Sequence, residues 1–339
     1  MRLTKAAQPS DKRPQAEHPS TNRGNALAGL LSKRAGGFLL FTILYGCVFA
    51  AHFTHLFRFS LEQQHYSHFS LIPLVSFYLM YLHRQTLLAQ AAYWARGGIP
   101  VVLLGVLCYL LGLELRSSLN QHDIVALMTF GVIIVWVGGF MTFFGLPTTR
   151  IALFPLGFLI FMIPLPEALL SSVITALQYA SAEVVSLLFE LTPVPVARDG
   201  LFFALPGLTI EVASECSSIR SSLALFITCV LANHLLLRRW WSKAVVLLLV
   251  FPLAVFKNGV RIVTLCLLTL HVDKGFMQGD LHTRGGAVFF GLALAILVPI
   301  FLGLGKLEAR HADPGQEAGE PAEGRDRNYG SSSDQEHCP

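Results

Sequence analysis

The sequence predicts an all-α, polytopic membrane bundle of about eight transmembrane helices. Hydrophobic residues make up 53% of the 339 residues and charged residues only 14%, against roughly 25% charged residues in an average soluble domain. Several apolar runs reach the roughly 20 residues that a helix needs to cross a bilayer. Between residues 192 and 213 the pattern changes to Pro, Gly and alternating apolar residues, which predicts a small hairpin outside the spans.

Polar tails flank the apolar part of the chain. Residues 1–36 are basic and rich in Pro, Gln, Ser and Asn, so that they cannot form a core, and they predict a disordered tail. Residues 37–305 are expected to form one transmembrane domain. Residues 306–339 are acidic and rich in Gly, Pro and Ser, and they predict a second disordered tail.

The apolar runs give the order of the expected elements. We expect spans at about 38–57, 69–83, 98–113, 124–144, 150–165, 219–237, 244–270 and 286–304. Residues 167–191 carry polar positions every three or four residues, which is typical of an amphipathic helix at the membrane interface, although a ninth span that lines a cavity is the alternative. The alternating runs on either side of Pro206 and Gly207 predict the hairpin.

The distribution of Lys and Arg predicts the orientation of the chain. In an eight-span arrangement, most of these residues outside the spans fall on the side that also holds both tails. Short loops with an excess of Lys and Arg stay on the cytoplasmic side. We therefore expect a multi-pass protein of the cytoplasmic (inner) membrane, with both tails in the cytoplasm and the hairpin on the periplasmic or extracellular side.

The segment 206–222 crowds polar groups against the start of an apolar run, with Cys216 at its centre. Glu215 precedes the cysteine, and Arg220 shares a face with it if the run is helical. A cation beside a thiol at a helix N-terminus lowers the pKa of the thiol and makes a thiolate nucleophile available. A lone cysteine beside an apolar segment is more often inert packing, so the assignment needs partners elsewhere in the chain.

Two further sites supply such partners. Lys257, Asn258 and Arg261 interrupt an apolar stretch, and polar groups there should face a wet cavity lined by protein. His282 lies in the loop before the last span. The orientation derived from charge alone brings Cys216, Arg261 and His282 to one side of the membrane. A cysteine nucleophile needs a base and a group that stabilises the oxyanion, and His282 and Arg261 have that chemistry.

Each of these residues also has a simpler explanation. Arg261 could reach lipid headgroups by snorkelling, and His282 could be an ordinary loop histidine. Arg220 could pair with Glu215 or Glu211 instead of acting on the thiol.

Composition argues against other classes of partner. The formal net charge of +4, without a basic helix or zinc-ligand spacing, does not suggest nucleic acid. The cysteines show neither metal-ligand spacing nor a disulfide framework, so we expect no metal and no cofactor. The bilayer and a membrane molecule are the expected partners.

Three ordered motifs resemble the exosortase/archaeosortase family. They are Glu-Cys-Ser-Ser-Ile-Arg-Ser-Ser from Glu215, Lys-Asn-Gly-Val-Arg-Ile from Lys257 and Asp-Leu-His-Thr-Arg-Gly-Gly from Asp280, and Phe-Met-Ile-Pro-Leu-Pro from Phe161 is similar to that family as well. The resemblance covers roughly residues 38–304. It implies a membrane cysteine transpeptidase whose nucleophile is Cys216, with Arg261 and His282 as partners. Ser218 is a departure, because the family usually has glycine after Cys-Ser.

The resemblance also implies the substrate. Such enzymes act on membrane-anchored, exported proteins that end in a short motif such as Pro-Glu-Pro, a membrane span and a basic end. We therefore expect cleavage of such a signal through a thioester, with Glu215, Arg220 and Asn258 in supporting roles and with an amine, another acceptor or water receiving the acyl group. The alternatives are a transporter or lipid-handling protein in which Lys257, Arg261 and His282 line a permeation or headgroup site, and a structural subunit of a polysaccharide export complex.

Overall fold

The computed structural model of the chain describes residues 19–213, 219–273 and 286–312. Apart from one small sheet, these residues form helices joined by short connections, and the prediction of an all-α, polytopic membrane bundle is confirmed. The chain divides into two compact units. The first comprises Met1–Ser186 and Pro193–Ala224, and the second comprises Leu187–Thr192 and Leu225–Pro339.

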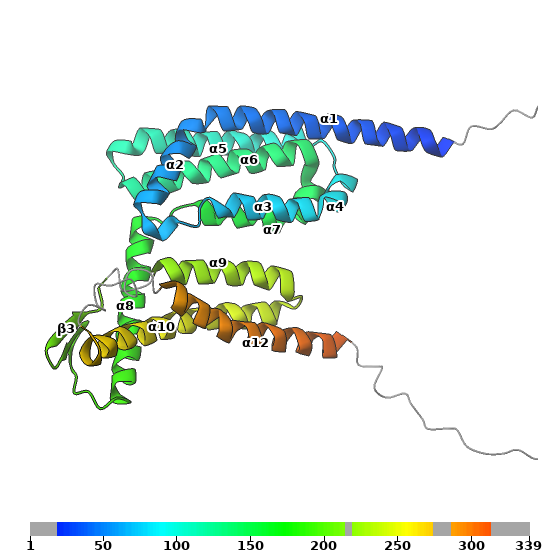
Figure 1. The fold of residues 1–339 in the computed structure, drawn as a ribbon. Helices are drawn as coiled ribbons and strands as arrows, with labels where there is room; N and C mark the ends of the chain where they lie inside the picture. Colours follow the sequence, from blue (N-terminus) through cyan, green and yellow to red (C-terminus); the bar gives the residue numbers. More distant parts are fainter. Residues whose placement is uncertain (1–18, 214–218, 274–285, 313–339) are drawn as a thin grey trace, which may run out of the picture. The chain divides into compact units, whose positions relative to one another are not determined.

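The first unit contains the helices up to most of α8, together with the sheet. The helices are α1 (Pro19–Val48), α2 (Ala50–Glu62), α3 (Leu71–Leu82), α4 (Arg84–Ala89), α5 (Ala95–Glu114), α6 (Gln121–Ile151), α7 (Leu153–Phe158) and α8 (Glu167–Glu190), with 3-10 turns η1 (Gln64–Tyr66), η2 (Leu115–Ser117) and η3 (Leu159–Met162). In Figure 1, α5 and α6 run side by side, α1 lies along α6, and α3 lies along α7.

Glycines bring α5 and α6 into backbone contact. Gly98, Gly105 and Gly112 recur every seven residues on α5 and are buried. A Cβ atom added to Gly105 would lie 2.6 Å from the backbone nitrogen of Val135 and 2.7 Å from the carbonyl oxygen of Gly131. Small residues allow this approach, and dispersion between closely packed backbones then holds the helices together without a hydrophobic driving force.

A kink interrupts α6 near its C-terminal end. Gly145 has a φ of 80°, which a residue with a side chain rarely adopts, and Pro147 follows it. Backbone carbonyl groups just before the kink accept hydrogen bonds from the segment that precedes α5. The N–H group of Ala92 donates to the carbonyl oxygen of Phe144 and that of Trp94 to the carbonyl oxygen of Thr142, each at 2.9 Å. The kink therefore fixes the start of α5 against the end of α6.

Among the described residues, fewer helices than the expected eight have the length of a full span. Six helices are long and apolar enough to cross a membrane, or up to seven if α1 and α2, which bend by 65°, form one span. In place of the spans at 69–83 and 150–165 there are two shorter apolar helices, Leu71–Leu82 and Leu153–Met162. Twelve helical residues cover only about 18 Å, less than the hydrocarbon core.

The two short helices pack on each other. Ser76 donates to the carbonyl of Pro155 at 2.6 Å in a buried position. They end early because the chain turns at His83 and Ile163, both of which leave the helical conformation. We expected α8 to lie at the membrane interface, with a ninth span as the alternative. Its length and hydropathy are those of a span, in line with the alternative.

Both terminal helices extend beyond the boundaries expected from composition. α1 begins at Pro19, inside the range 1–36, and α12 (Gly286–Ala312) continues past residue 305. Proline suits the first turn of a helix, and the Ala- and Leu-rich residues 26–31 favour helix strongly enough to join the following apolar run.

The sheet contains three antiparallel strands in the order β1 (Ala197–Asp199), β2 (Phe202–Leu205) and β3 (Leu208–Glu211). β2 and β3 form the hairpin that the sequence indicates, with Leu205 opposite Leu208. Between them Gly207 has a φ of 76°, so Pro206 and Gly207 have the residue types of a type II turn. The side chains of Phe203, Leu205 and Ile210 are buried, as the period of two in a half-buried strand requires.

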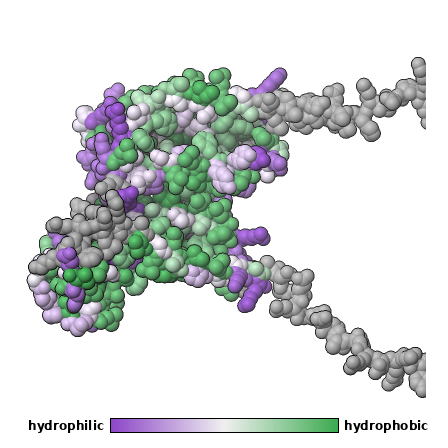
Figure 2. All heavy atoms as spheres, in the orientation of Figure 1, coloured by the Kyte–Doolittle hydropathy of each residue, from purple (hydrophilic) through white to green (hydrophobic). Residues whose placement is uncertain are grey.

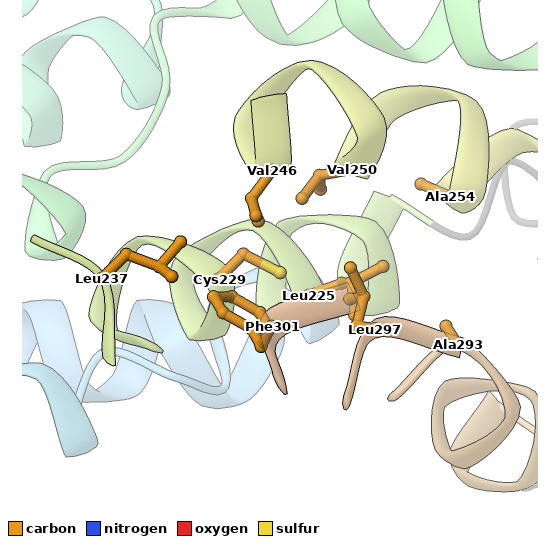
Figure 3. Close-up of a cluster of buried hydrophobic side chains, with 9 residues drawn as sticks. All are labelled: Leu225, Cys229, Leu237, Val246, Val250, Ala254, Ala293, Leu297 and Phe301. Atoms are coloured by element: carbon orange, nitrogen blue, oxygen red, sulfur yellow. The ribbon is translucent and has the colours of Figure 1, made fainter. Parts of the chain in front are cut away.

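The second unit is built on most of α9 (Ile219–Leu236), α10 (Trp240–His271) and α12. Three rows of buried side chains pack against one another to form its apolar core (Figure 3). α9 and the residue after it contribute Leu225, Cys229 and Leu237, α10 contributes Val246, Val250 and Ala254, and α12 contributes Ala293, Leu297 and Phe301. The rows from α9 and α12 run in the opposite direction to that from α10. Both helices are therefore antiparallel to α10.

Glu308 closes one end of this bundle. Its side chain is only 7% exposed and accepts hydrogen bonds from the backbone N–H groups of Arg238, at 2.8 Å, and Arg239, at 3.0 Å. Arg239 is the residue before the first turn of α10. A carboxylate at a helix N-terminus satisfies free N–H groups and interacts favourably with the helix dipole. The last turns of α12 are thereby tied to the connection between α9 and α10.

Apolar side chains cover much of the outer surface of the helices (Figure 2). On α5, for example, Leu103, Leu107 and Leu110 are half exposed or more. A soluble protein would not expose apolar patches of this extent, whereas a lipid bilayer solvates them.

Candidate active site

The predicted site residues fall partly inside and partly outside the described residues. Glu215 and Cys216 belong to 214–218, and His282 belongs to 274–285; all three lie outside the described residues. Arg220, Asn258 and Arg261 are described. The described helices and the sheet lead into the predicted site.

Lys257 and Asn258 are two deeply buried polar residues of α10. Lys257 is 2% exposed and Asn258 is 1% exposed, and Arg261, one turn later, is partly exposed. A charged or amide side chain is buried in an apolar helix only where protein groups or water can solvate it. Their burial agrees with the expectation that both face protein and not lipid.

These polar residues continue the core row of α10. Val246, Val250 and Ala254 pack in the apolar core, and the next positions on the same face are 257, 258 and 261. The face that carries the core of the bundle thus changes from apolar to polar within one turn after Ala254. At this end the interior is suited to hold a charge.

Arg220 lies in the first turn of α9, with an exposed side chain. The described part of α9 begins at Ile219, whose side chain is buried. We expected Cys216 and Arg220 to share one face of a helix. Cys216 lies outside the described residues.

The sheet and α8 anchor the chain just before Cys216. The amide of Gln178 on α8 donates to the carbonyl of Val212 at 2.9 Å, and the side chain of Val212 is fully buried. Phe203 of β2 is also fully buried and lies opposite Ile210 of β3. The last residues before the candidate nucleophile are therefore held by burial and by a hydrogen bond to α8.

An ion pair adds a second link between the sheet and α8. Arg198 of β1 donates two hydrogen bonds to the carboxylate of Glu183, at 2.7 and 3.0 Å, and these bonds raise the pKa of Arg198 above its ordinary value. Because the Glu183 side chain is 70% exposed, solvent screens the pair, and it contributes little to stability. Burial of Phe203 and Val212 contributes more to the attachment of the sheet.

A second polar cluster lies in the first unit, where the turn after α2 meets the starts of α6 and α8. His122 Nε2 lies 3.8 Å from a carboxylate oxygen of Glu167, and Asp123 accepts a hydrogen bond from the Glu167 N–H at 2.9 Å. The Tyr66 ring packs against His122 with ring centroids 6.2 Å apart. Burial raises the pKa of Tyr66 to about 12. The sequence analysis missed this cluster, because its members come from three segments.

Among the described residues, no group of three His, Cys, Asp or Glu side chains could hold a metal ion. The polar groups that surround the predicted site are amides, cations and single carboxylates. Their chemistry is that of hydrogen bonding and charge stabilisation.

Comparison with known proteins identifies the family. A family model described as transmembrane exosortase matches residues 60–299, which is more than half of the chain. The chain belongs to the transmembrane exosortase family. No curated protein and no solved structure matches the chain significantly.

The family membership states the function in general terms. As a transmembrane exosortase, the chain is a multi-pass protein and a membrane transpeptidase that acts on membrane proteins with sorting signals. The matched residues run from α2 into α12 and include all three ordered motifs of the sequence. The family expected from those motifs is thereby confirmed.

The anchoring residues found in the structure had only weak signals in the sequence. Gln178 and Glu183 are two of the regularly spaced polar positions of residues 167–191, and that spacing indicated a helix without indicating what it holds. Glu308 lies beyond the boundary at 305 and was assigned to a tail. A polar residue on an otherwise apolar helix is the one signal that these three share.

Proposed function

We propose that this transpeptidase uses Cys216 as its nucleophile, with Arg261 and His282 as partners, to cleave C-terminal sorting signals of exported proteins. The substrate is a membrane-anchored protein that ends in a short motif of the Pro-Glu-Pro type, a span and a basic end. The reaction takes place at the outer face of the cytoplasmic membrane, beside the substrate's span.

The observation that supports this proposal most directly is that the core face of α10 becomes polar near the end of the bundle at which α9 and α12 begin. Arg261 lies about two turns beyond Ala254, towards the end at which α9 and α12 begin. α9 begins about two turns before Leu225, and α12 begins about two turns before Ala293. Cys216 precedes α9 by three residues and His282 precedes α12 by four. This order of the chain supports a common site.

The chemistry follows from the three groups. The Cys216 thiolate attacks the scissile carbonyl carbon, and the Arg261 guanidinium stabilises the charge on the carbonyl oxygen. The carbon–nitrogen bond then breaks, and His282 donates a proton to the leaving amine, which leaves a thioester on Cys216. An amine or another acceptor, deprotonated by His282, attacks the thioester and releases the thiol; water gives hydrolysis instead.

The supporting residues act through position. Asn258 lies one turn before Arg261 on the buried face of α10, where its amide can orient the guanidinium or the substrate. Arg220 and Glu215 flank the nucleophile in sequence and would set its charge environment. The polar tails at 1–36 and 306–339 are proposed to lie in the cytoplasm.

The first prediction tests the nucleophile. We expect Cys216→Ala to abolish cleavage of a reporter that ends in Pro-Glu-Pro, a hydrophobic span and an Arg-rich end, because the proposed thioester forms on the Cys216 sulfur. The measurement is the mass of the reporter in cells that produce each variant. Cys108→Ala, which removes a thiol from α5, is the matched control and should cleave at the normal rate.

The same assay separates the partners from the alternatives. Arg261→Gln should lower the rate about 10²–10³-fold, as loss of an oxyanion donor does, and His282→Ala should lower it about 10²–10⁴-fold. Full processing by the Cys216→Ala protein would refute the assignment. A transporter would instead tolerate that change and would not lose its activity to a thiol reagent applied from outside.

A further inference from the structure

A polar pocket lies in the first unit, away from the motifs that carry the proposed chemistry. Its volume is about 590 Å³, and it is lined by residues from α2, from α5 and η2, and from the first turns of α6. It lies where α5 ends and α6 begins, and Figure 2 shows hydrophilic side chains gathered over this end of the unit.

Side chains with nitrogen donors form part of the lining of the pocket. It includes His52, His55 and Arg116, and among the described residues that line it there is no carboxylate. Within the described part of the chain, neither His55 nor Arg116 has a hydrogen-bond or ion-pair partner. Gln121 adds an amide that can donate as well. The donors outnumber the acceptors, so that an anion would satisfy them.

Part of this donor-bearing lining is rigid. His52 is 4% exposed, and its Nε2 atom lies 3.1 Å from the hydroxyl of Thr129 on α6. Its ring meets that of Tyr109 on α5 edge to face, with centroids 5.7 Å apart. Side chains held in this way lose little entropy when a ligand binds.

Apart from Gln121, the residues that α6 contributes to the pocket are apolar, and so is the neighbouring surface of α5. Ile124, Val125 and Met128 of α6 line the pocket. α5, which supplies Tyr109, exposes Leu103 and Leu107 outward, as a lipid-facing helix does. Arg116 lies at the end of the candidate span 95–117, which is the depth of a lipid headgroup. A lipid whose chains lie along α5 would thus bring its headgroup to Arg116.

We propose that this pocket binds the phosphate-bearing, anionic headgroup of a membrane phospholipid. The Arg116 guanidinium makes charge-assisted hydrogen bonds to the phosphate oxygens, and the imidazole of His55 and the amide of Gln121 add donors. The apolar wall on α6 receives the first carbons of the lipid. Lipid at this position fills a pocket between three helices of the first unit and stabilises their packing.

The test is thermal unfolding of the full chain in a neutral detergent. Short-chain phosphatidylglycerol should raise the unfolding temperature, and phosphatidylcholine with the same chains should raise it less, because it has no net negative charge. For Arg116→Gln we expect the phosphatidylglycerol concentration at half-maximal effect to rise about tenfold or more. His55→Gln should raise it as well. Arg58→Gln is the matched control, since Arg58 is exposed on α2 and does not line the pocket.

Three outcomes would overturn the proposal. One is an equal response to the two lipids. Another is that Arg116→Gln and His55→Gln respond to phosphatidylglycerol like the unchanged protein and the Arg58→Gln control. The third is that inorganic phosphate stabilises the protein as effectively as the lipid, in which case the pocket is a site for a free anion. None of these measurements depends on cleavage of a substrate, so the result is independent of the proposed catalytic residues.

Discussion

Burial determines the acid–base behaviour of the side chains between α2 and α3. The rings of Tyr66 and Phe69 are almost fully buried and stack with centroids 4.7 Å apart, and His68 packs edge to face on Phe69 at 5.2 Å. Burial lowers the pKa of His68 below its ordinary value of 6.5, although the carbonyl groups of Phe161 and His65 partly oppose this. The neutral imidazole is therefore the form that fits the fold.

This shift predicts a loss of stability in acid. Because the folded chain binds the His68 proton less tightly than the unfolded chain, protonation favours unfolding, and stability falls as the pH drops below about 6.5. We expect the decrease in unfolding temperature between pH 7.5 and pH 5.5 to be smaller for His68→Gln. The unchanged protein, measured in the same detergent over the same pH range, provides the reference. An unchanged decrease in His68→Gln would show that this residue contributes nothing to the pH dependence.

At the scale of elements, the α5–α6 pair depends on glycine at its contact points. A Cβ atom at Gly131 of α6 would lie 2.7 Å from the carbonyl oxygen of Gly105 and 2.7 Å from the backbone nitrogen of Tyr109. Both obstacles are backbone atoms of α5, so they can move only if the whole helix moves. The pattern of glycines seven residues apart, visible in the sequence, acquires its meaning from the partner helix.

Gly131→Ala should therefore destabilise the first unit by about 1–3 kcal/mol, the usual effect of overpacking a tight contact. The matched control is Gly291→Ala on α12, where an added Cβ atom would have no atom within 4 Å. That change should be neutral or stabilise by up to about 1 kcal/mol through helix propensity. The measurement is the unfolding temperature of each variant in the same detergent. Equal effects of the two changes would mean that α5 and α6 do not pack this closely.

At the scale of the whole molecule, the orientation proposed from Lys and Arg positions can be tested on two exposed positions. Thr209 lies on β3, beside the hairpin turn, and Trp240, which is 81% exposed, begins α10 at the opposite end of α9. We expect a membrane-impermeant thiol reagent to label Thr209→Cys in intact cells, and to label Trp240→Cys only after the cells are permeabilised. Peptide mass spectrometry locates the label. The reverse pattern would invert the orientation and would place the candidate nucleophile in the cytoplasm.

Hydrophobicity and local motifs account for the parts of the fold that were predicted correctly. The runs around α5, α6, α10 and α12 are long and apolar, and a bilayer accepts few other structures for such segments. The runs at 69–83 and 150–165 have a similar composition, but α3 and α7 are short because they pack on each other within the first unit. Composition shows how apolar a segment is. The length of the helix that it forms depends on where the backbone turns to pack against the neighbouring elements.

For the candidate site too, the sequence predicted some residues and not others. Lys257, Asn258 and Arg261 were found because polar groups in an apolar run are expensive to bury, and the burial of Lys257 and Asn258 agrees with that reasoning. Cys216 and His282 came from the motifs, and they remain proposals. Gln178, Glu308 and the Arg116 pocket were missed, because each depends on a partner distant in the sequence.

By itself, the sequence determined the class of the protein, its family motifs and the residues from which a catalytic site is proposed. These properties follow from residue types and their spacing, which are local. Only the tertiary structure decided which apolar runs are full-length helices, where two helices touch through glycine, and which polar groups anchor the sheet and close the bundle. Such contacts join residues far apart in the chain, and their energies depend on the geometry of packing, which no local pattern contains.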